Sequence, residues 1–318
     1  MCIRDRPFIV AGQRVAPGTR RQINLPAGRL PSGTELSLRL QVLHGTELGP
    51  TIWMSGAIHG DEIVGVEIIR RVLETIDERE LRGTVIAVPV VNVFGFVAES
   101  RYLPDRRDLN RSFPGSRRGS LASRLARLFV DNVLEPTEFG IDFHAGSDDR
   151  TNLPQIRGNL EDQETRRLAT AFSAPLMIHA KTIKGSLRET AVKRGKRVLL
   201  FEGGEPRRFN PGPVQAGADG ALRVLHALSM IEASPVSMIE SAEASSATWV
   251  RAPRGGIFHL QTRLGARVRR GELIGIITEP SGRGGREVRA RASGMIMGHA
   301  VNPLVHQGDS LVHIAAMD

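Results

Sequence analysis

The sequence predicts a three-layer α/β domain followed by a small all-β domain. Over most of the chain, short apolar segments of strand length alternate with segments in which apolar residues recur every three or four positions. This alternation is typical of a sheet that is covered by helices on both faces. After residue 248 no helical period is evident, and short β-rich runs punctuated by glycine indicate a small barrel or sandwich.

Four segments build the first part of the α/β domain. Residues 35–42 alternate apolar and polar side chains, as a half-buried strand does. Residues 51–58 and 84–91 are apolar nearly throughout, which is typical of buried central strands. Between them, over 63–76, apolar residues recur with the spacing of one helix face, so a helix is expected there.

A long polar loop, rich in arginine and proline, covers 92–118 and leads to the second part of the domain. Ser120 is the expected N-cap of a helix that continues to Leu134. The remaining predicted elements are strands at 140–144, 175–179 and 197–201, and helices near 160–172 and at 212–230.

Composition places the domain boundaries. The larger domain is expected over 7–235 and the small β domain over 249–318. Residues 231–248 are small and polar and are predicted to link the two. Residues 1–6 fit no predicted element.

Cysteine and hydropathy exclude several classes of protein. Cys2 is the only cysteine, so an internal disulfide framework and a thiolate metal site are excluded, and any metal must use histidine and carboxylates. No apolar run reaches the roughly 20 residues that a bilayer span needs, and the first residues lack the apolar core of a signal peptide. We therefore expect a cytoplasmic protein without a membrane partner.

The formal net charge of +9 is carried almost entirely by arginine. A basic chain can bind nucleic acid or anionic lipid. The arginines are scattered rather than packed in one stripe with interleaved aromatics, which favours a solvated basic surface. We predict no nucleic-acid partner, and a non-enzymatic nucleic-acid-binding module is the third functional alternative, favoured only by salt-sensitive DNA binding without hydrolysis.

His59 and Glu62 follow the predicted central strand, where a helix begins. In α/β sheets ligands bind at the carboxyl ends of strands. Gly60 allows the backbone to turn tightly, so that both side chains can face one ion. Zinc accepts imidazole nitrogen and carboxylate oxygen at about 2.0–2.2 Å. Taken alone, the motif also fits a surface pair or a helix cap.

Asp142 and His144 end another predicted strand, and the period of two places them on the same side of it. His144 is a candidate third ligand, and Asp142 is a candidate acceptor for the other N–H of its imidazole. The alternative is a strand-end histidine that pairs only with its neighbour. Two histidines and one glutamate leave the fourth position of a tetrahedral zinc open for water, which is the catalytic pattern.

The loop 92–118 and the end of the strand 197–201 supply further polar groups. Asn110 and Arg111 offer an amide and a planar fork suited to a carboxylate, and Arg101 offers a guanidinium for a developing oxyanion. A solvated basic loop is the alternative. Glu202, before two glycines, is the candidate general base and acid, and Glu205 competes with it.

Four polar segments carry a resemblance: 59–62, 108–115, 142–144 and 201–205. In this chain order they resemble the succinylglutamate desuccinylase/aspartoacylase family, a branch of the zinc carboxypeptidase-like fold. The resemblance covers about residues 50–230, and the family also carries a small C-terminal β domain. It implies that the larger domain is a zinc-dependent catalytic domain in which His59, Glu62 and His144 bind one Zn²⁺ per chain.

The resemblance also implies roles for the other candidates. Asn110 and Arg111 would grip the substrate carboxylate, Arg101 would polarise the carbonyl, and Glu202 would move the proton. The stretch from residue 101 to 110 is longer than in the aspartoacylase branch, so Arg106 and Arg107 are alternatives to Arg101.

The expected reaction is hydrolysis of the amide bond of an N-acyl amino acid or a related carboxylate-bearing amide. Zinc lowers the pKa of its water, the general base takes the proton, and the leaving amine receives it. A metallocarboxypeptidase that acts on peptides is the alternative enzyme. Release of free acyl groups rather than C-terminal residues would separate the two.

The C-terminal runs resemble a biotinyl/lipoyl-like barrel. Such domains attach their cofactor to a lysine, and residues 249–318 contain none, so a carrier function is excluded. A lid or scaffold beside the active-site mouth, or a contact within a homo-oligomer, are the alternatives left open. The histidines of this domain are more typical of ordinary barrel positions than of a second metal site: His259, His299, His306 and His313.

Overall fold

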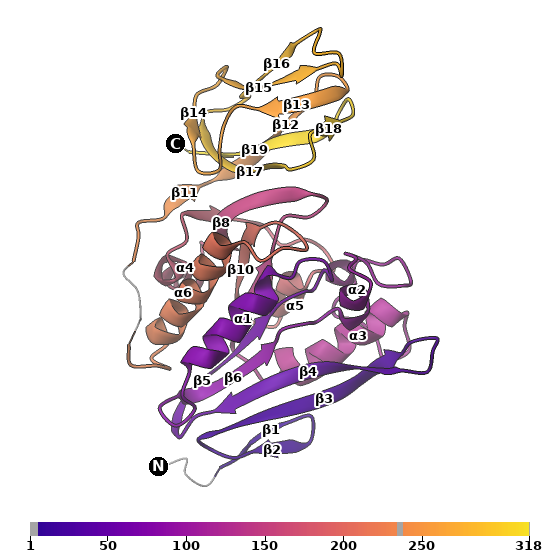
Figure 1. The fold of residues 1–318 in the computed structure, drawn as a ribbon. Helices are drawn as coiled ribbons and strands as arrows, with labels where there is room; N and C mark the ends of the chain where they lie inside the picture. Colours follow the sequence, from indigo (N-terminus) through magenta and orange to yellow (C-terminus); the bar gives the residue numbers. More distant parts are fainter. Residues whose placement is uncertain (1–5, 234–237, 318) are drawn as a thin grey trace.

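The computed structural model describes residues 6–233 and 238–317 (Figure 1). Four parallel strands form the centre of its main sheet, and they lie side by side in the order β10, β7, β5, β6. Their bounds are Arg197–Gly204, Phe139–His144, Glu47–Ser55 and Arg82–Val88. Because these strands are parallel, their carboxyl ends meet along one edge of the domain.

Antiparallel strands extend the sheet on both sides. β4 (Glu35–His44) pairs with β6, and β3 (Thr19–Arg29) follows it. On the other side β8 (Arg150–Gly158) pairs antiparallel with β10, and β9 (Leu176–His179) runs parallel to β8. A separate hairpin of β1 (Phe8–Val10) and β2 (Gln13–Val15) precedes them in the chain.

Helices cover both faces of the sheet, so the predicted three-layer α/β/α arrangement is confirmed (Figure 1). One face packs against α1, α4 and α6, which are Val64–Thr75, Gln163–Phe172 and Pro211–Ala227. The other packs against α2, α3 and α5, which are Val93–Val97, Leu121–Phe129 and Leu187–Lys193. No helix in the described ranges combines the length and apolarity needed to span a membrane.

The side chains of the central strands alternate between the two helical layers. Phe143 and Phe201 belong to the core beneath α1, α4 and α6. Their neighbours Asp142 and Glu202 therefore point to the opposite face, where α5 lies. This alternation decides which polar side chains can share one site.

The C-terminal part is β-rich and is joined to the main sheet by hydrogen bonds. β17 (Gly294–Ala300) pairs with β8, and β19 (Ser310–Ala316) and β12 (Ser246–Arg251) follow it in the sheet order. Short strands β11 (Ala242–Ala244) and β14 (Arg267–Val268) pair with β9 and β17. A second sheet has the order β16, β15, β13, β18, with bounds Arg286–Arg289, Leu273–Thr278, Gly256–Leu260 and Leu304–Val305.

Several predicted bounds were wrong. The strands expected at 51–58 and 84–91 end earlier, at Ser55 and Val88. The helix expected to reach Leu134 does end there, but its last turn, over Val130–Leu134, is π-helical. The loop 92–118 contains α2 and a 3₁₀ turn over Leu109–Arg111.

β8 and α5 also escaped prediction. β8 carries polar residues and Pro154, which does not read as a strand, and α5 is only seven residues long. β11 and the start of β12 lie within the predicted linker 231–248, of which residues 234–237 are outside the described ranges. The domain boundaries stay a prediction.

Candidate metal centre

Three polar segments converge at the carboxyl ends of neighbouring strands. His59 and Glu62 lie between β5 and α1, His144 is the last residue of β7, and Glu202 lies near the end of β10. Gly60 is required here for close approach, because a Cβ at this position would lie 2.0 Å from the backbone carbon of Gly95. The predicted reason was a tight turn, whereas the structure shows crowding against the backbone of α2.

His59, Glu62 and His144 form a buried cluster, as the sequence predicted. One ligand atom from each residue lies within 4.8 Å of the others. Nδ1 of His59 is 2.8 Å from Oε1 of Glu62, and Nδ1 of His144 is 2.9 Å from its Oε2. All three residues are buried, with Glu62 only 1% exposed. Two imidazole nitrogens and a carboxylate at this spacing are a donor set that fits a divalent metal ion.

A carboxylate holds the second nitrogen of each imidazole. Nε2 of His144 lies 2.8 Å from Oδ2 of Asp142, whose Oδ1 accepts a hydrogen bond from Ser55 at 2.7 Å. Nε2 of His59 lies 3.3 Å from Oδ1 of Asp108. Both rings therefore turn Nδ1 towards Glu62. The hydrogen bond with Asp142 fixes the ring of His144, as in metal-binding histidines, whereas Asp108 contacts His59 only as an ion pair.

Arg101 lies against the same cluster. Its Nη1 donates to Oε1 of Glu62 at 3.3 Å and to Ser147 at 2.6 Å, and its Nη2 donates to Oδ2 of Asp108 at 2.9 Å. Arg106 and Arg107, the alternatives from the sequence, are both exposed. The geometry thus favours Arg101 over Arg106 and Arg107 as the guanidinium beside the candidate metal ligands.

Neighbouring carboxylates favour the charged form of both imidazoles. Burial lowers the pKa of His144, but Asp142 and Glu62 outweigh this effect and raise it well above its ordinary value. Burial raises the pKa of Glu62, yet the charge on His59 and the hydrogen bonds from both histidines hold it well below its usual range. The carboxylates around the two imidazoles therefore favour positive charge at this place, as the binding of a divalent cation would require.

Glu202 lies near this cluster, and its side chain accepts a hydrogen bond from a residue of β8. Nδ2 of Asn152 donates to its Oε2 at 2.9 Å. Burial raises the pKa of Glu202, and the charges of Arg157 and His144 oppose this effect. Glu205, the competing candidate, forms an ion pair with Arg208, with Oε2 of Glu205 3.7 Å from Nε of Arg208.

Asn110 and Arg111 differ in burial. Asn110 is buried, and its Oδ1 accepts from the backbone N–H of Leu187 at 2.9 Å, which ties the loop to the start of α5. Arg111 is exposed, and its Nη1 donates to the carbonyl of Asn110 at 2.7 Å. The amide oxygen of Asn110 is therefore engaged, while the guanidinium of Arg111 faces solvent.

Residues 48–228, more than half of the chain, match the family described as the succinylglutamate desuccinylase/aspartoacylase catalytic domain. The chain belongs to this family. The resemblance inferred from the four segments is thereby confirmed, and so is the fold class, since solved members share the architecture.

Relatives in this family align with most of the chain. The chain is 28% identical over 283 residues to an N-alpha-acetyl-L-2,4-diaminobutyric acid deacetylase of Halomonas elongata, covering 84% of this chain and 82% of the relative. A succinylglutamate desuccinylase/aspartoacylase from Rhodobacter sphaeroides is 27% identical, with a TM-score of 0.81 and coverage of 94% and 96%. The product-bound ectoine utilization protein EutE (DoeB) from Ruegeria pomeroyi shares the fold at 24% identity, with a TM-score of 0.84 and coverage of 94% and 95%.

Sequence reasoning missed four polar residues that complete the site: Ser55, Asp108, Ser147 and Asn152. Asp108 could have been found, because it directly precedes the 3₁₀ turn and caps it through Asn110 N at 2.8 Å. Ser55 pairs in register with Asp142 on the adjacent strand, a relation that exists only in the folded sheet.

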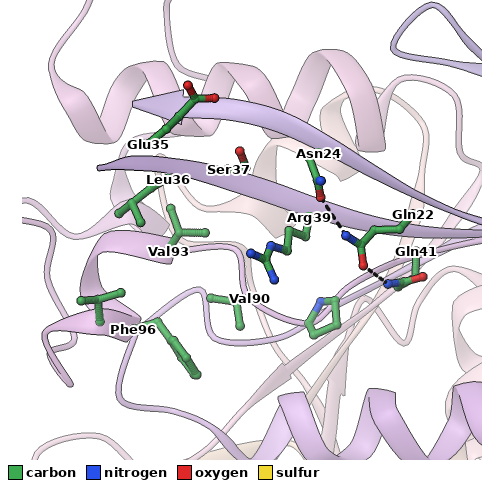
Figure 2. Close-up of a pocket in the computed structure, with 12 residues that line it drawn as sticks. Gln22, Asn24, Glu35, Leu36, Ser37, Arg39, Gln41, Val90, Val93 and Phe96 are labelled. Carbon is green, nitrogen blue, oxygen red and sulfur yellow. Dashed lines mark hydrogen bonds between the residues drawn. The ribbon is translucent and has the colours of Figure 1, made fainter. Parts of the chain in front are cut away.

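A cavity of about 450 Å³ lies elsewhere, between the β3–β4 hairpin and the segment that leads into α2 (Figure 2). Arg39 projects into it, and Gln22 forms hydrogen bonds with Asn24 and Gln41 along its strand side. None of the candidate site residues lines this cavity. It therefore contributes nothing to the metal centre.

Proposed function

We propose that this chain is a zinc-dependent amidohydrolase that removes the acyl group from an N-acyl amino acid. One observation carries the proposal: two buried imidazoles present Nδ1 to Glu62, and the half-buried Glu202 pairs in register with His144 on the neighbouring strand. Membership of a deacylase family supports the same reaction class.

In the proposed reaction, each polar residue has a separate task. A zinc ion held by His59, Glu62 and His144 would supply Lewis-acid charge and a water of lowered pKa when bound. Glu202 takes a proton from the attacking water and delivers it to the nitrogen of the leaving amine, and its raised pKa suits both steps.

Arginine and amide groups hold the substrate. Nη1 of Arg101, which reaches Glu62 at 3.3 Å, stabilises the negative charge that develops on the carbonyl oxygen. Asn110 and Arg111 bind a carboxylate of the substrate through the free Nδ2 and the exposed guanidinium. Ser147, which donates to Glu62 at 2.7 Å, keeps that ligand oriented.

The first substrates to test are N-acetylated amino acids, because the relative from Halomonas elongata is named a deacetylase of an N-acetylated diamino acid. A metallocarboxypeptidase and a nucleic-acid-binding module stay alternatives that the same assays exclude or support. The cytoplasmic location and the homo-oligomer stay predictions.

The decisive assay measures acyl release from a panel of N-acyl amino acids and short peptides. We expect activity on N-acyl amino acids, loss of activity with a chelator, and recovery on adding zinc. Glu202→Gln should lose activity, whereas Glu205→Gln, a matched change three residues away, should retain it. Full activity in the chelated protein or in Glu202→Gln would refute the proposal, and release of C-terminal residues instead of acyl groups would favour the carboxypeptidase.

A further inference from the structure

Two further polar side chains share the sheet face of Glu202. Gln155 on β8 pairs in register with Glu202 on β10, and Arg157 pairs with Leu200. Cross-strand partners point to the same side, and Ile156 between them belongs to the opposite core. Gln155, Arg157 and Glu202 therefore face the α5 layer together.

Both side chains carry buried polar atoms that lack partners. Gln155 is 0% exposed, and neither its Nε2 nor its Oε1 has a hydrogen-bond partner within the described ranges. The same holds for the buried Nε of Arg157. Of the seven such atoms found among described residues, three belong to this pair. A buried polar group without a partner is costly, so a pair of them side by side indicates a ligand that completes them.

The charge of Arg157 affects the pKa of three neighbouring groups: Glu202, Arg188 and His313. It opposes the burial that raises the pKa of Glu202. Burial, reinforced by the charge of Arg157, lowers the pKa of Arg188 to about 10. Burial also lowers the pKa of His313 to about 4, with Arg157 adding to the effect, and His313 comes from β19 of the C-terminal part. Arg157 and Arg188 thus lie close enough to Glu202 for their charges to act on one another.

A guanidinium beside an amide donor suits a carboxylate, which accepts from both. Neighbouring strands lie about 4.8 Å apart, and the α-carboxylate of an amino acid is two bonds from its nitrogen. A substrate whose leaving nitrogen meets Glu202 on β10 can therefore set its α-carboxylate over β8.

We propose that Gln155 and Arg157 form a subsite that binds the α-carboxylate of the amino-acid half of the substrate. This subsite rests on the proposed deacylase function. Where the substrate carries a second anionic group, at the acyl end or on the amino-acid side chain, Asn110 and Arg111 bind that group. Glu202, on the strand between β7 and β8, then separates the subsite from the metal ligand on β7.

The first test compares an N-acetyl amino acid that the enzyme cleaves with the same compound as its α-carboxamide. We expect kcat/KM of the wild-type enzyme to favour the acid by about 100-fold or more, because a site built to bind a group rejects analogues that lack it. Arg157→Gln should reduce that preference to less than about tenfold, mainly through KM for the acid. Arg39→Gln, an exposed arginine outside the site, should leave the preference unchanged.

Arg111→Gln tests the rival assignment. If it abolishes the preference while Arg157→Gln retains it, Arg111 binds the α-carboxylate and the subsite on β8 is refuted. If the wild-type enzyme cleaves no N-acyl amino acid, the proposed function itself fails. The two failures are therefore distinguishable.

Thermal unfolding of Gln155→Met gives a second readout. Because the amide of Gln155 has no partner in the described structure, an apolar side chain of similar shape should leave the unfolding midpoint unchanged or raise it. The same variant should raise KM for the acid. A lower midpoint with an unchanged KM would show that the amide serves the fold, which contradicts the proposal.

Discussion

Asn152 is predicted to set the pH at which Glu202 works. Nδ2 of Asn152 donates to Oε2 of Glu202 at 2.9 Å, and burial of Glu202 raises its pKa. A hydrogen bond to the ionised carboxylate favours the charged form, so losing it should raise the pKa further. Hydrogen bonds to charged groups contribute about 1.5–3 kcal/mol, which corresponds to roughly one to two pH units at 1.36 kcal/mol per unit.

The measurement is the pH profile of kcat/KM for Asn152→Ala. The acid limb of the profile reports the general base of the free enzyme, so we expect it to move upward by roughly one to two pH units. Asn152→Asp should move it further, because a second carboxylate opposes ionisation. Asn159→Ala, which removes a side chain that accepts from Glu161 N, is the matched control and should leave the limb in place. An unmoved acid limb in both Asn152 variants would contradict the reasoning.

Three further predictions follow from the same contacts. In Gly298→Ala, the added Cβ would lie 2.7 Å from Oδ1 of Asn152, the residue that donates to Glu202. We expect kcat to fall about tenfold while the circular dichroism spectrum stays unchanged. An unchanged kcat would show that β17 does not hold Asn152 in place. Asp142→Ala leaves Nε2 of His144 without its carboxylate, and competition with a chelator should show zinc affinity lowered about 10–100-fold; equal affinity would count against an orienting role. The hydrogen bond from Arg70, with that from Arg71, lowers the pKa of Glu67 to about 2, so its stabilising effect is complete above its unfolded value and is lost as pH falls towards 2. Urea unfolding of Glu67→Gln should therefore differ from wild type at neutral pH and converge with it near pH 2, and a constant difference would contradict this.

The cluster of proposed metal ligands was predictable from sequence because the positions of its residues depend on local order. His59 and His144 each end a buried apolar segment, and parallel strands bring such ends to one edge. Glu62 follows His59 within the same turn. The helical and strand periods were strong enough to fix the three-layer arrangement without tertiary information.

The residues that orient those ligands were not predictable in the same way. Asp108 reaches His59 from a loop across the site. Asn152 lies on β8, which was not predicted as a strand because it contains Pro154. Gln155 and Arg157 share that strand, so their relation to Glu202 appears only once β8 is placed beside β10. Such contacts depend on strand order rather than on spacing along the chain.

Anomalous diffraction at the zinc edge, from crystals grown with zinc, tests the central claim most directly. We expect one peak per chain, at about 2.0–2.2 Å from Nδ1 of His59, a carboxylate oxygen of Glu62 and Nδ1 of His144. A peak held by other residues, or none at this cluster, would contradict it.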